Sequence, residues 1–296
     1  MKLDYLLLDV FTAERFKGNP LAVVLKADGL LDDEMQAIAA EFNLSETVFF
    51  VKPQSERNTA AVRIFTPKVE LPFAGHPTVG AAVVLALNGK LSVARIEEKV
   101  GLVTATVERI DKRTGAARFA LPRLPEVAGE APGKTEIASA LGLKHEEIGC
   151  GEFQPSVYSA GNLFYLVPVR DAAALRRIER DHAVWERTFP LARHSVYVFT
   201  KTPDEAGVDF AARMFAPGMG VGEDPATGSA AAALIGLLAR HAGIAEGSRE
   251  YVLRQGYEIG RPSRIDMQLN MEGGKLVHAS IGGRAVVVGQ GVLDLD

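Results

Sequence analysis

Glu46 is the side chain best suited to proton transfer in this 296-residue chain, because it directly precedes the apolar run Thr47–Val51. A carboxylate in that position is usually solvated or caps a neighbouring element. In an apolar cleft, however, burial would raise its pKa above the usual value of about 4.3 and make it an acid or base near neutrality. The matching stretch of the second half, His194–Tyr197, has no carboxylate. The sequence therefore predicts a single proton carrier on one wall of a site.

Two short triplets, each followed by an apolar, alanine-containing segment, are candidate anion sites. They read Ala74-Gly75-His76 and Thr227-Gly228-Ser229. Backbone N–H groups at a helix start lack intrahelical partners and lie at the positive end of the helix dipole, so they can hold a carboxylate or phosphate. One such glycine alone is better explained by tight packing under a buried helix. Two matched starts in one chain favour a site for a small anionic ligand.

His76 and Asp224 lie beside these helix starts and can assist an acid. Each also has a simpler interpretation, His76 as a polar N-cap and Asp224, which precedes Pro225, as a turn residue. If both side chains converge with Glu46, they would orient a substrate and tune the acid.

The chain carries the same pattern twice. Gly18-Asn19-Pro20 and Gly161-Asn162 each lead into an apolar run, and Arg63–Pro67 and Arg213–Pro217 both read Arg-x-Phe-x-Pro, 150 positions apart. Together with a length that suits two domains, the repeat predicts two like halves facing each other across one cleft. The proline-rich stretch Pro122–Gly133 is the expected linker.

Short strand-like runs and a few helices must position these residues. Turn residues rather than helices separate most of the runs, which favours a mixed or antiparallel sheet. Helices are expected over Asp32–Glu41, Pro77–Leu87 and Gly228–His241. The last two are apolar on almost all sides and should be buried, so each half is expected to wrap a sheet round a central helix in an α+β fold. The strand-like runs are Tyr5–Val10, Leu21–Leu25, Thr47–Val51, Ala61–Phe65, Val103–Ile110, Ala117–Leu121 and the tail Ala285–Leu295.

Composition and spacing exclude several classes of function. The net charge is −4 and no basic stripe is present, so nucleic acid is not expected as a partner. The six histidines lack metal-ligand spacing, the glycines of Gly218–Gly222 lack the nucleotide-loop interval, and Ser229 is not in a hydrolase elbow. Cys150 is the only cysteine and is expected to be structural. With neither a signal peptide nor a membrane span, the protein is expected in the cytoplasm.

Five linked motifs resemble the phenazine-biosynthesis PhzF-like family, in order and over essentially the whole chain. They are Phe16–Val23, Asn43–Thr47, Arg63–Pro67 with Leu71–Pro77, Glu223–Ala231, and Gln255-Gly256 with Glu258–Ser263.

The resemblance implies the diaminopimelate-epimerase-like fold, with two pseudo-symmetric barrel-like domains and the active site between them. The N-terminal domain is expected over residues 1–120, together with the C-terminal segment 282–296, which returns to it. The C-terminal domain is expected over residues 121–281. The resemblance also implies a homodimer, and neither a metal nor an organic cofactor.

The resemblance further implies a single-glutamate mechanism. Related epimerases and racemases use two facing cysteines, and those positions read Ala74 and Thr227 here. Ala74 cannot take a proton, which argues against two-base racemisation. The match assigns proton transfer to Glu46, with His76, Asp224 and Ser229 as its helpers. The residues it assigns to substrate binding are Asn19, Gly75, Thr78, Thr227 and Gly228.

The predicted function is a cofactor-independent isomerase that moves a proton within a small cyclic or unsaturated amino acid, such as trans-2,3-dihydro-3-hydroxyanthranilate. Two alternatives stay open at this point. An amino-acid epimerase or racemase would need a second base opposite Glu46. A non-catalytic small-ligand-binding protein would keep the same fold and use the same residues only to bind.

Overall fold

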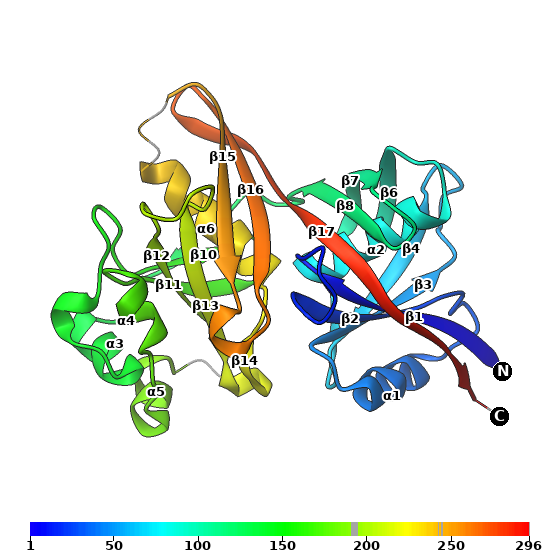
Figure 1. Cartoon of the computed structure of the whole chain (residues 1–296), viewed down its shortest axis with the longest axis horizontal. Coiled ribbons are helices and arrows are strands. Elements are labelled where there is room, and N and C mark those ends of the chain that lie inside the picture. Colours follow the sequence, from blue (N-terminus) through cyan, green and yellow to red (C-terminus); the bar gives the residue numbers. More distant parts are fainter. Residues whose placement is uncertain (191–194, 242, 244, 296) are drawn as a thin grey trace. The chain divides into compact units, whose positions relative to one another are not determined.

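The computed structural model describes residues 1–190, 195–241, 243 and 245–295 (Figure 1). His194, part of the stretch compared with Glu46 above, lies outside these residues. The chain divides into two compact units. Unit 1 comprises Met1–Pro122 together with the chain from Ser280 onward, and unit 2 comprises Arg123–Ala279.

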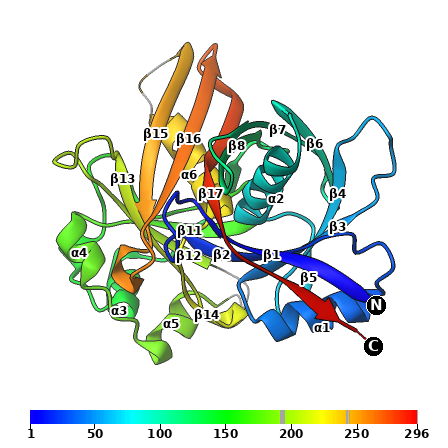
Figure 2. The same ribbon diagram turned by 45° about the vertical axis from the view of Figure 1, so that its right-hand side comes forward.

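The sheet of unit 1 closes on itself. Each strand pairs with the next in the order β1, β2, β3, β4, β6, β7, β8 and β17, and β17 then pairs with β1 (Figure 2). The short β5 (Glu70–Leu71) adds to β4. The bounds are β1 Lys2–Val10, β2 Asn19–Val24, β3 Glu46–Val51, β4 Ala60–Phe65, β6 Val93–Glu98, β7 Gly101–Arg109, β8 Thr114–Ala120 and β17 Lys275–Asp294.

Helix α2 (Gly75–Asn88) occupies the inside of this sheet and packs against β1, β2, β3, β6, β7 and β8. Its residues are buried over almost its whole length, as the apolar sequence predicts. Gly80 allows the close approach, because a Cβ there would lie 2.3 Å from Leu21 Cδ2. The predicted central helix is therefore confirmed for this unit.

Helix α1 (Asp32–Phe42) covers the outer face of the same sheet. Its apolar side packs with outward-facing strand residues in a cluster that includes Met35, Ile38, Val24, Phe49 and Phe65. Because side chains alternate along a strand, Phe49 on this outer face leaves Glu46 and Val48 of β3 on the inner face.

Unit 2 repeats the strand pairing of unit 1. In unit 2 the pairs β11–β12 and β13–β15 are parallel, like β2–β3 and β4–β6 in unit 1. The pairs β12–β13 and β15–β16 are antiparallel, like β3–β4 and β6–β7 in unit 1. The sequence repeat therefore corresponds to a repeated topology. The bounds are β9 Glu126–Gly129, β10 Ser156–Ser159, β11 Leu163–Pro168, β12 Ser195–Lys201, β13 Phe210–Ala216, β14 Val221–Asp224, β15 Gly247–Gln255 and β16 Ser263–Glu272.

Helix α6 (Gly228–His241) is the buried helix of unit 2 and contacts β9, β10, β11 and β16. Three shorter helices, α3 (Lys134–Leu141), α4 (Ala172–Arg176) and α5 (His182–Thr188), share a second core with the sheet. That core is centred on aromatic residues such as Trp185, Phe189 and Phe215. Single 3₁₀ turns lie at His145–Glu147, Pro217–Met219 and Tyr257–Ile259.

The repeated Arg-x-Phe-x-Pro motif has the same structural role in both units. Arg63 of β4 pairs with Glu70 of β5 at 2.8 Å, and Arg213 of β13 pairs with Glu223 of β14 at 2.7 Å. Each guanidinium also lies over the phenylalanine two residues later. These ion pairs fasten the strands that lead into α2 and α6.

The structure differs from the expected linker and tail. The stretch Pro122–Gly133 contains strand β9, which pairs with β10. The tail strand begins well before Ala285, since β17 starts at Lys275. Residues 280–286 of β17 pair with β8 and residues 285–294 with β1.

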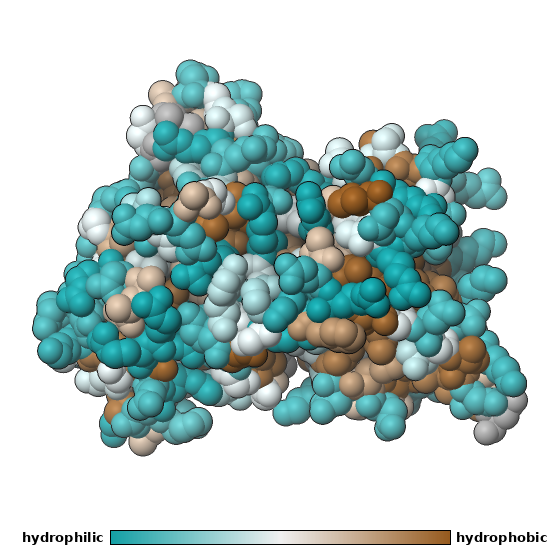
Figure 3. Space-filling model, viewed as in Figure 1, coloured by the Kyte–Doolittle hydropathy of each residue, from teal (hydrophilic) through white to brown (hydrophobic). Residues whose placement is uncertain are grey.

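The surface view shows hydrophobic side chains in scattered patches among hydrophilic ones (Figure 3). Among the described residues, none of the helices combines the length and apolar character needed to cross a membrane.

Candidate active site

Glu46 and His76 form a pair on the inner wall of unit 1. Glu46 begins β3 with its side chain on the inner face, and His76 is the second residue of α2. His76 Nδ1 lies 3.5 Å from Glu46 Oε2. The His76 side chain is 5% exposed and that of Glu46 is 17% exposed. The acid is therefore shielded but still reachable.

The imidazole of His76 is neutral at physiological pH. Burial lowers its pKa to about 3. Within the described part of the chain, His76 Nε2 has no hydrogen-bond partner. A neutral ring with one nitrogen toward Glu46 and the other unbonded can orient the acid and a ligand, but it cannot hold the transferred proton.

We expect the His76 ring to show no titration between about pH 5 and pH 8, in contrast to the ordinary histidine pKa of about 6.5. The measurement is ¹⁵N NMR of ring nitrogens in histidine-labelled protein, with the His76 signals assigned by their loss in His76→Asn. A midpoint above about pH 5.5 for those signals would contradict the neutral imidazole.

The other predicted residues of unit 1 are Asn19, at the start of β2, and Gly75 and Thr78, in the first turn of α2. Asn19 is fully buried and pairs with Val10 at the beginning of β2. The preceding Gly18 has φ +64°, and a Cβ there would lie 2.3 Å from the Val10 carbonyl oxygen, so only glycine fits. Gly75 is the first residue of α2.

Thr78 is already engaged within the protein. Its N–H donates to Ala74 O at 3.2 Å, and its hydroxyl lies 2.8 Å from Ala74 O and 2.8 Å from Glu98 Oε1. Pro77 has no N–H, so the first-turn donors that could serve a ligand here are those of Gly75 and His76.

In unit 2, Asp224 and Thr227 lie in one buried hydrogen-bond network centred on Gln255. The Thr227 hydroxyl donates to Asp224 Oδ2 at 2.6 Å. Gln255 Oε1 accepts from Thr227 N–H at 3.1 Å and from the Tyr197 hydroxyl at 3.0 Å. Gln255 Nε2 donates to Asp224 O at 2.8 Å and to Thr227 Oγ1 at 3.0 Å. The amide of Gln255 thus fixes both ends of the loop before α6.

Two further residues hold the same loop. Ser263 Oγ lies 3.1 Å from Pro225 O and 2.9 Å from Arg261 O, and either carbonyl can accept its single hydrogen. Gly256 has φ +78°, and a Cβ there would lie 2.6 Å from Pro225 O. The motif Gln255-Gly256 with Ser263 therefore supports Asp224, and Gly228 and the half-buried Ser229 follow as the first residues of α6.

The structure thus brings Glu46 together with His76, and Asp224 together with Thr227. It also reveals three buried polar residues that had no predicted role, namely Glu98, Tyr197 and Gln255. Burial is the main reason that the pKa of Tyr197 is raised, and the nearby charge of Asp224 adds to the effect. The phenol of Tyr197 therefore keeps its proton and stays a hydrogen-bond donor.

Cys150 is buried and accepts a hydrogen bond from the Thr200 hydroxyl at 3.8 Å. Over the described ranges, the His, Cys, Asp and Glu side chains form no group of three or more that could hold a metal ion.

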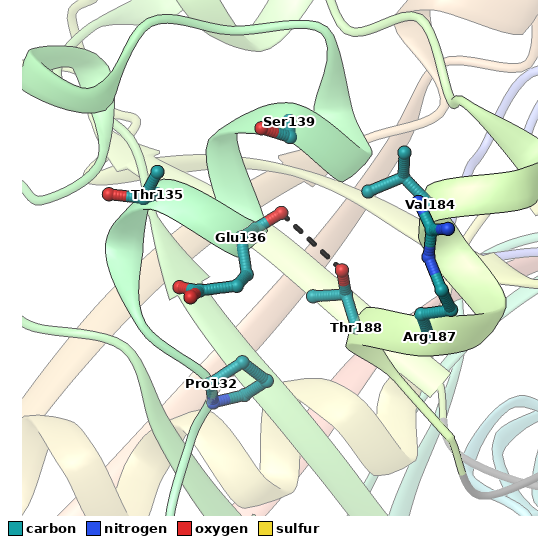
Figure 4. Close-up of a pocket in the computed structure, with 7 residues that line it drawn as sticks. All are labelled: Pro132, Thr135, Glu136, Ser139, Val184, Arg187 and Thr188. Atoms are coloured by element: carbon teal, nitrogen blue, oxygen red, sulfur yellow. Dashed lines mark hydrogen bonds between the residues drawn. The ribbon is translucent and has the colours of Figure 1, made fainter.

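A shallow groove of about 370 Å³ lies between α3 and α5 (Figure 4). It is lined by Pro132, Thr135, Glu136, Ser139, Val184, Arg187 and Thr188. The Thr188 hydroxyl donates to the Glu136 carbonyl oxygen at 3.4 Å across it. None of the predicted site residues lines this groove.

The chain is similar to known proteins over nearly its whole length. Residues 8–291 match the family described as phenazine biosynthesis-like protein. An uncharacterised isomerase of Mesorhizobium japonicum is 44% identical, with 98% of each chain covered. A trans-2,3-dihydro-3-hydroxyanthranilate isomerase of Pseudomonas aeruginosa is 36% identical, with 97% of this chain and 98% of that one covered.

A solved structure shares the fold. The crystal structure of a Bacillus anthracis phenazine biosynthesis protein of the PhzF family superposes with a TM-score of 0.87 at 26% identity, covering all of both chains. The predicted diaminopimelate-epimerase-like fold is confirmed. This chain belongs to the phenazine biosynthesis-like (PhzF) family and is an isomerase.

Proposed function

We propose that this isomerase moves one proton within a small cyclic or unsaturated amino acid, with Glu46 as its only acid and base. The leading substrate is trans-2,3-dihydro-3-hydroxyanthranilate, the compound in the name of the similar Pseudomonas aeruginosa isomerase. The observation that carries the proposal is the shielded pair of Glu46 and neutral His76, 3.5 Å apart. Ala74 at the same helix start offers no second base.

In the proposed reaction, the ionised Glu46 carboxylate takes a proton from one carbon of the substrate and leaves the electron pair in the conjugated system. The protonated Glu46 then returns that proton to another carbon, so the enzyme ends as it began and atoms balance. His76 keeps the carboxyl group oriented and does not compete for the proton, because burial lowers its pKa to about 3.

The remaining predicted residues would bind and orient the substrate. Backbone N–H groups at Gly75 and Gly228 suit its carboxylate, because each lies at a helix start. Asp224 and Ser229 would bind the polar substituents of the substrate. Asn19, Thr78 and Thr227 would help to form the substrate-binding surface. Thr78 and Thr227 act mainly through their own hydrogen bonds to Ala74 and Asp224. The proposal includes a cytoplasmic homodimer and needs neither a metal nor an organic cofactor.

The test is proton NMR of the purified protein in D₂O with trans-2,3-dihydro-3-hydroxyanthranilate and a panel of L-amino acids. Loss of the dihydroaromatic signals with growth of an isomer supports the proposal. Deuterium entering at Cα of an unchanged amino acid would instead indicate an epimerase or racemase. If the compound binds but its spectrum does not change, it is not the substrate, and the isomerase acts on a different compound.

A further inference from the structure

Glu98 is a second carboxyl group next to the α2 start, and the proposed reaction does not use it. It is the last residue of β6, where Ala94, Ile96 and Glu98 are buried at alternate positions. That alternation places Glu98 on the inner face, with the adjacent Glu97 on the other face. Glu97 is held by Asn58 Nδ2 at 2.6 Å and by the N–H groups of Gln54 and Ser55.

The contacts of Glu98 indicate that it carries a proton. Glu98 Oε1 lies 2.8 Å from the Thr78 hydroxyl, which lies 2.8 Å from Ala74 O. A threonine hydroxyl has a single hydrogen, and a carbonyl oxygen can only accept. Both contacts are hydrogen bonds only if Thr78 donates to Ala74 O and Glu98 donates to Thr78.

The surroundings of Glu98 favour the same neutral form. It is 8% exposed, and within the described residues its Oε2 has no hydrogen-bond partner. Burial raises the pKa of Glu98 to about 8. A hydrogen bond donated by Thr78 would oppose this shift by favouring the ionised form, but the single Thr78 hydrogen is directed to Ala74 O. An ionised carboxylate with one unbonded buried oxygen would be costly.

The charged side chains closest to the end of β6 form ion pairs with residues other than Glu98. Arg63 pairs with Asp32 and Glu70, and Lys99 pairs with Glu70. The titratable residues of the packed elements are His76 on α2, Arg63 on β4, and Glu108 and Arg109 on β7, with Arg95, Glu97 and Lys99 on the β6 segment itself.

We propose that Glu98 is held as a neutral carboxylic acid at neutral pH and, through Thr78, positions the first turn of α2 for the isomerase reaction. This role rests on the proposed function, because that turn carries Gly75 and His76. Glu98 acts on this turn through its contact with Thr78, so it is a positioning residue. Its neutrality also leaves the helix start available to a substrate carboxylate, which a second anion would repel.

The first test asks directly whether Glu98 is protonated, and it needs no substrate. Infrared difference spectra between wild type and Glu98→Gln at about pH 7 should contain the carbonyl band of a neutral carboxylic acid, and that band should vanish above about pH 9. Glu97→Gln is the matched control and should remove only carboxylate bands. Absence of the acid band at pH 7 would overturn the proposal.

The second test uses the pH dependence of unfolding in urea. An unfolded glutamate loses its proton near pH 4.3, whereas folded Glu98 keeps it to about pH 8. Between these values unfolding releases a proton, so rising pH should increase the unfolding equilibrium constant about tenfold per pH unit from this group. Wild type should show this extra slope relative to Glu98→Gln. Equal slopes in the two proteins would contradict the assignment.

The third test separates positioning from mere stability. Glu98→Gln keeps a donor toward Thr78 and should retain most of the wild-type kcat and the His76 ring ¹⁵N shifts. Glu98→Ala loses the donor, and we expect kcat to fall about tenfold or more with the His76 signals displaced. If Glu98→Ala is folded and leaves both the His76 shifts and kcat unchanged, the positioning role is wrong. The NMR arm decides even if the substrate assignment fails.

Discussion

Glu46→Gln is expected to lower kcat by about 10² to 10⁴-fold while leaving the protein folded. Glutamine has nearly the shape of glutamate but cannot accept the substrate proton. Ala74 offers no substitute, and burial keeps His76 neutral with its pKa near 3. The other carboxyl group near this helix start, Glu98, is bonded to Thr78 and is proposed to carry a proton already, so it cannot accept the substrate proton in place of Glu46. The measurement is the rate of isomerisation by NMR under saturating substrate.

The matched control is Glu41→Gln, which makes the same chemical change at an exposed position of α1 and should keep wild-type activity. Substrate binding by Glu46→Gln, measured by calorimetry, should persist because the helix-start donors are untouched. A Glu46→Gln enzyme with more than a tenth of the wild-type kcat would rule out the single-glutamate mechanism.

The buried helices could be predicted because their composition leaves few alternatives. Segments as apolar as Pro77–Leu87 and Gly228–His241 must be covered on all sides, and α2 and α6 are the central helices of the two units. Strand β9 was missed because all four of its residues are exposed, so no apolar alternation indicates it. The start of β17 was missed for a similar reason, since Lys275–His278 are largely exposed.

The buried residues that hold the candidate site in place were harder to predict than the site residues themselves. Glu46, His76 and Asp224 lie in motifs, whereas Glu98 and Tyr197 read as ordinary strand residues. One signal was present in the sequence. Ala94, Ile96 and Glu98 keep the period of two, so the strand pattern alone places Glu98 on the inner face. For Gln255, the partners Tyr197 and Thr227 are 58 and 28 positions away, and only the fold reveals them.

Gln255→Leu is expected to destabilise the protein by about 3 to 5 kcal/mol, because Gln255 is 1% exposed and its amide makes four hydrogen bonds. Leucine would fill most of the space but leave the Tyr197 hydroxyl and the Thr227 N–H buried without an acceptor. Tyr197→Phe should cost only about 1 kcal/mol, because Gln255 Oε1 still accepts from Thr227. Urea unfolding of the three proteins gives both differences.

The same substitution should lower kcat by about 10²-fold in the fraction that is folded, since Asp224 and Thr227 lose the amide that fixes their loop. Tyr197→Phe separates the two effects, as it removes one buried hydrogen bond without releasing that loop. If Gln255→Leu has lost stability but retains full kcat, the network serves folding alone and Asp224 does not depend on it. If Gln255→Leu keeps both its stability and its kcat, the buried amide contributes little, and Ser263 and Gly256 would suffice to hold the loop before α6.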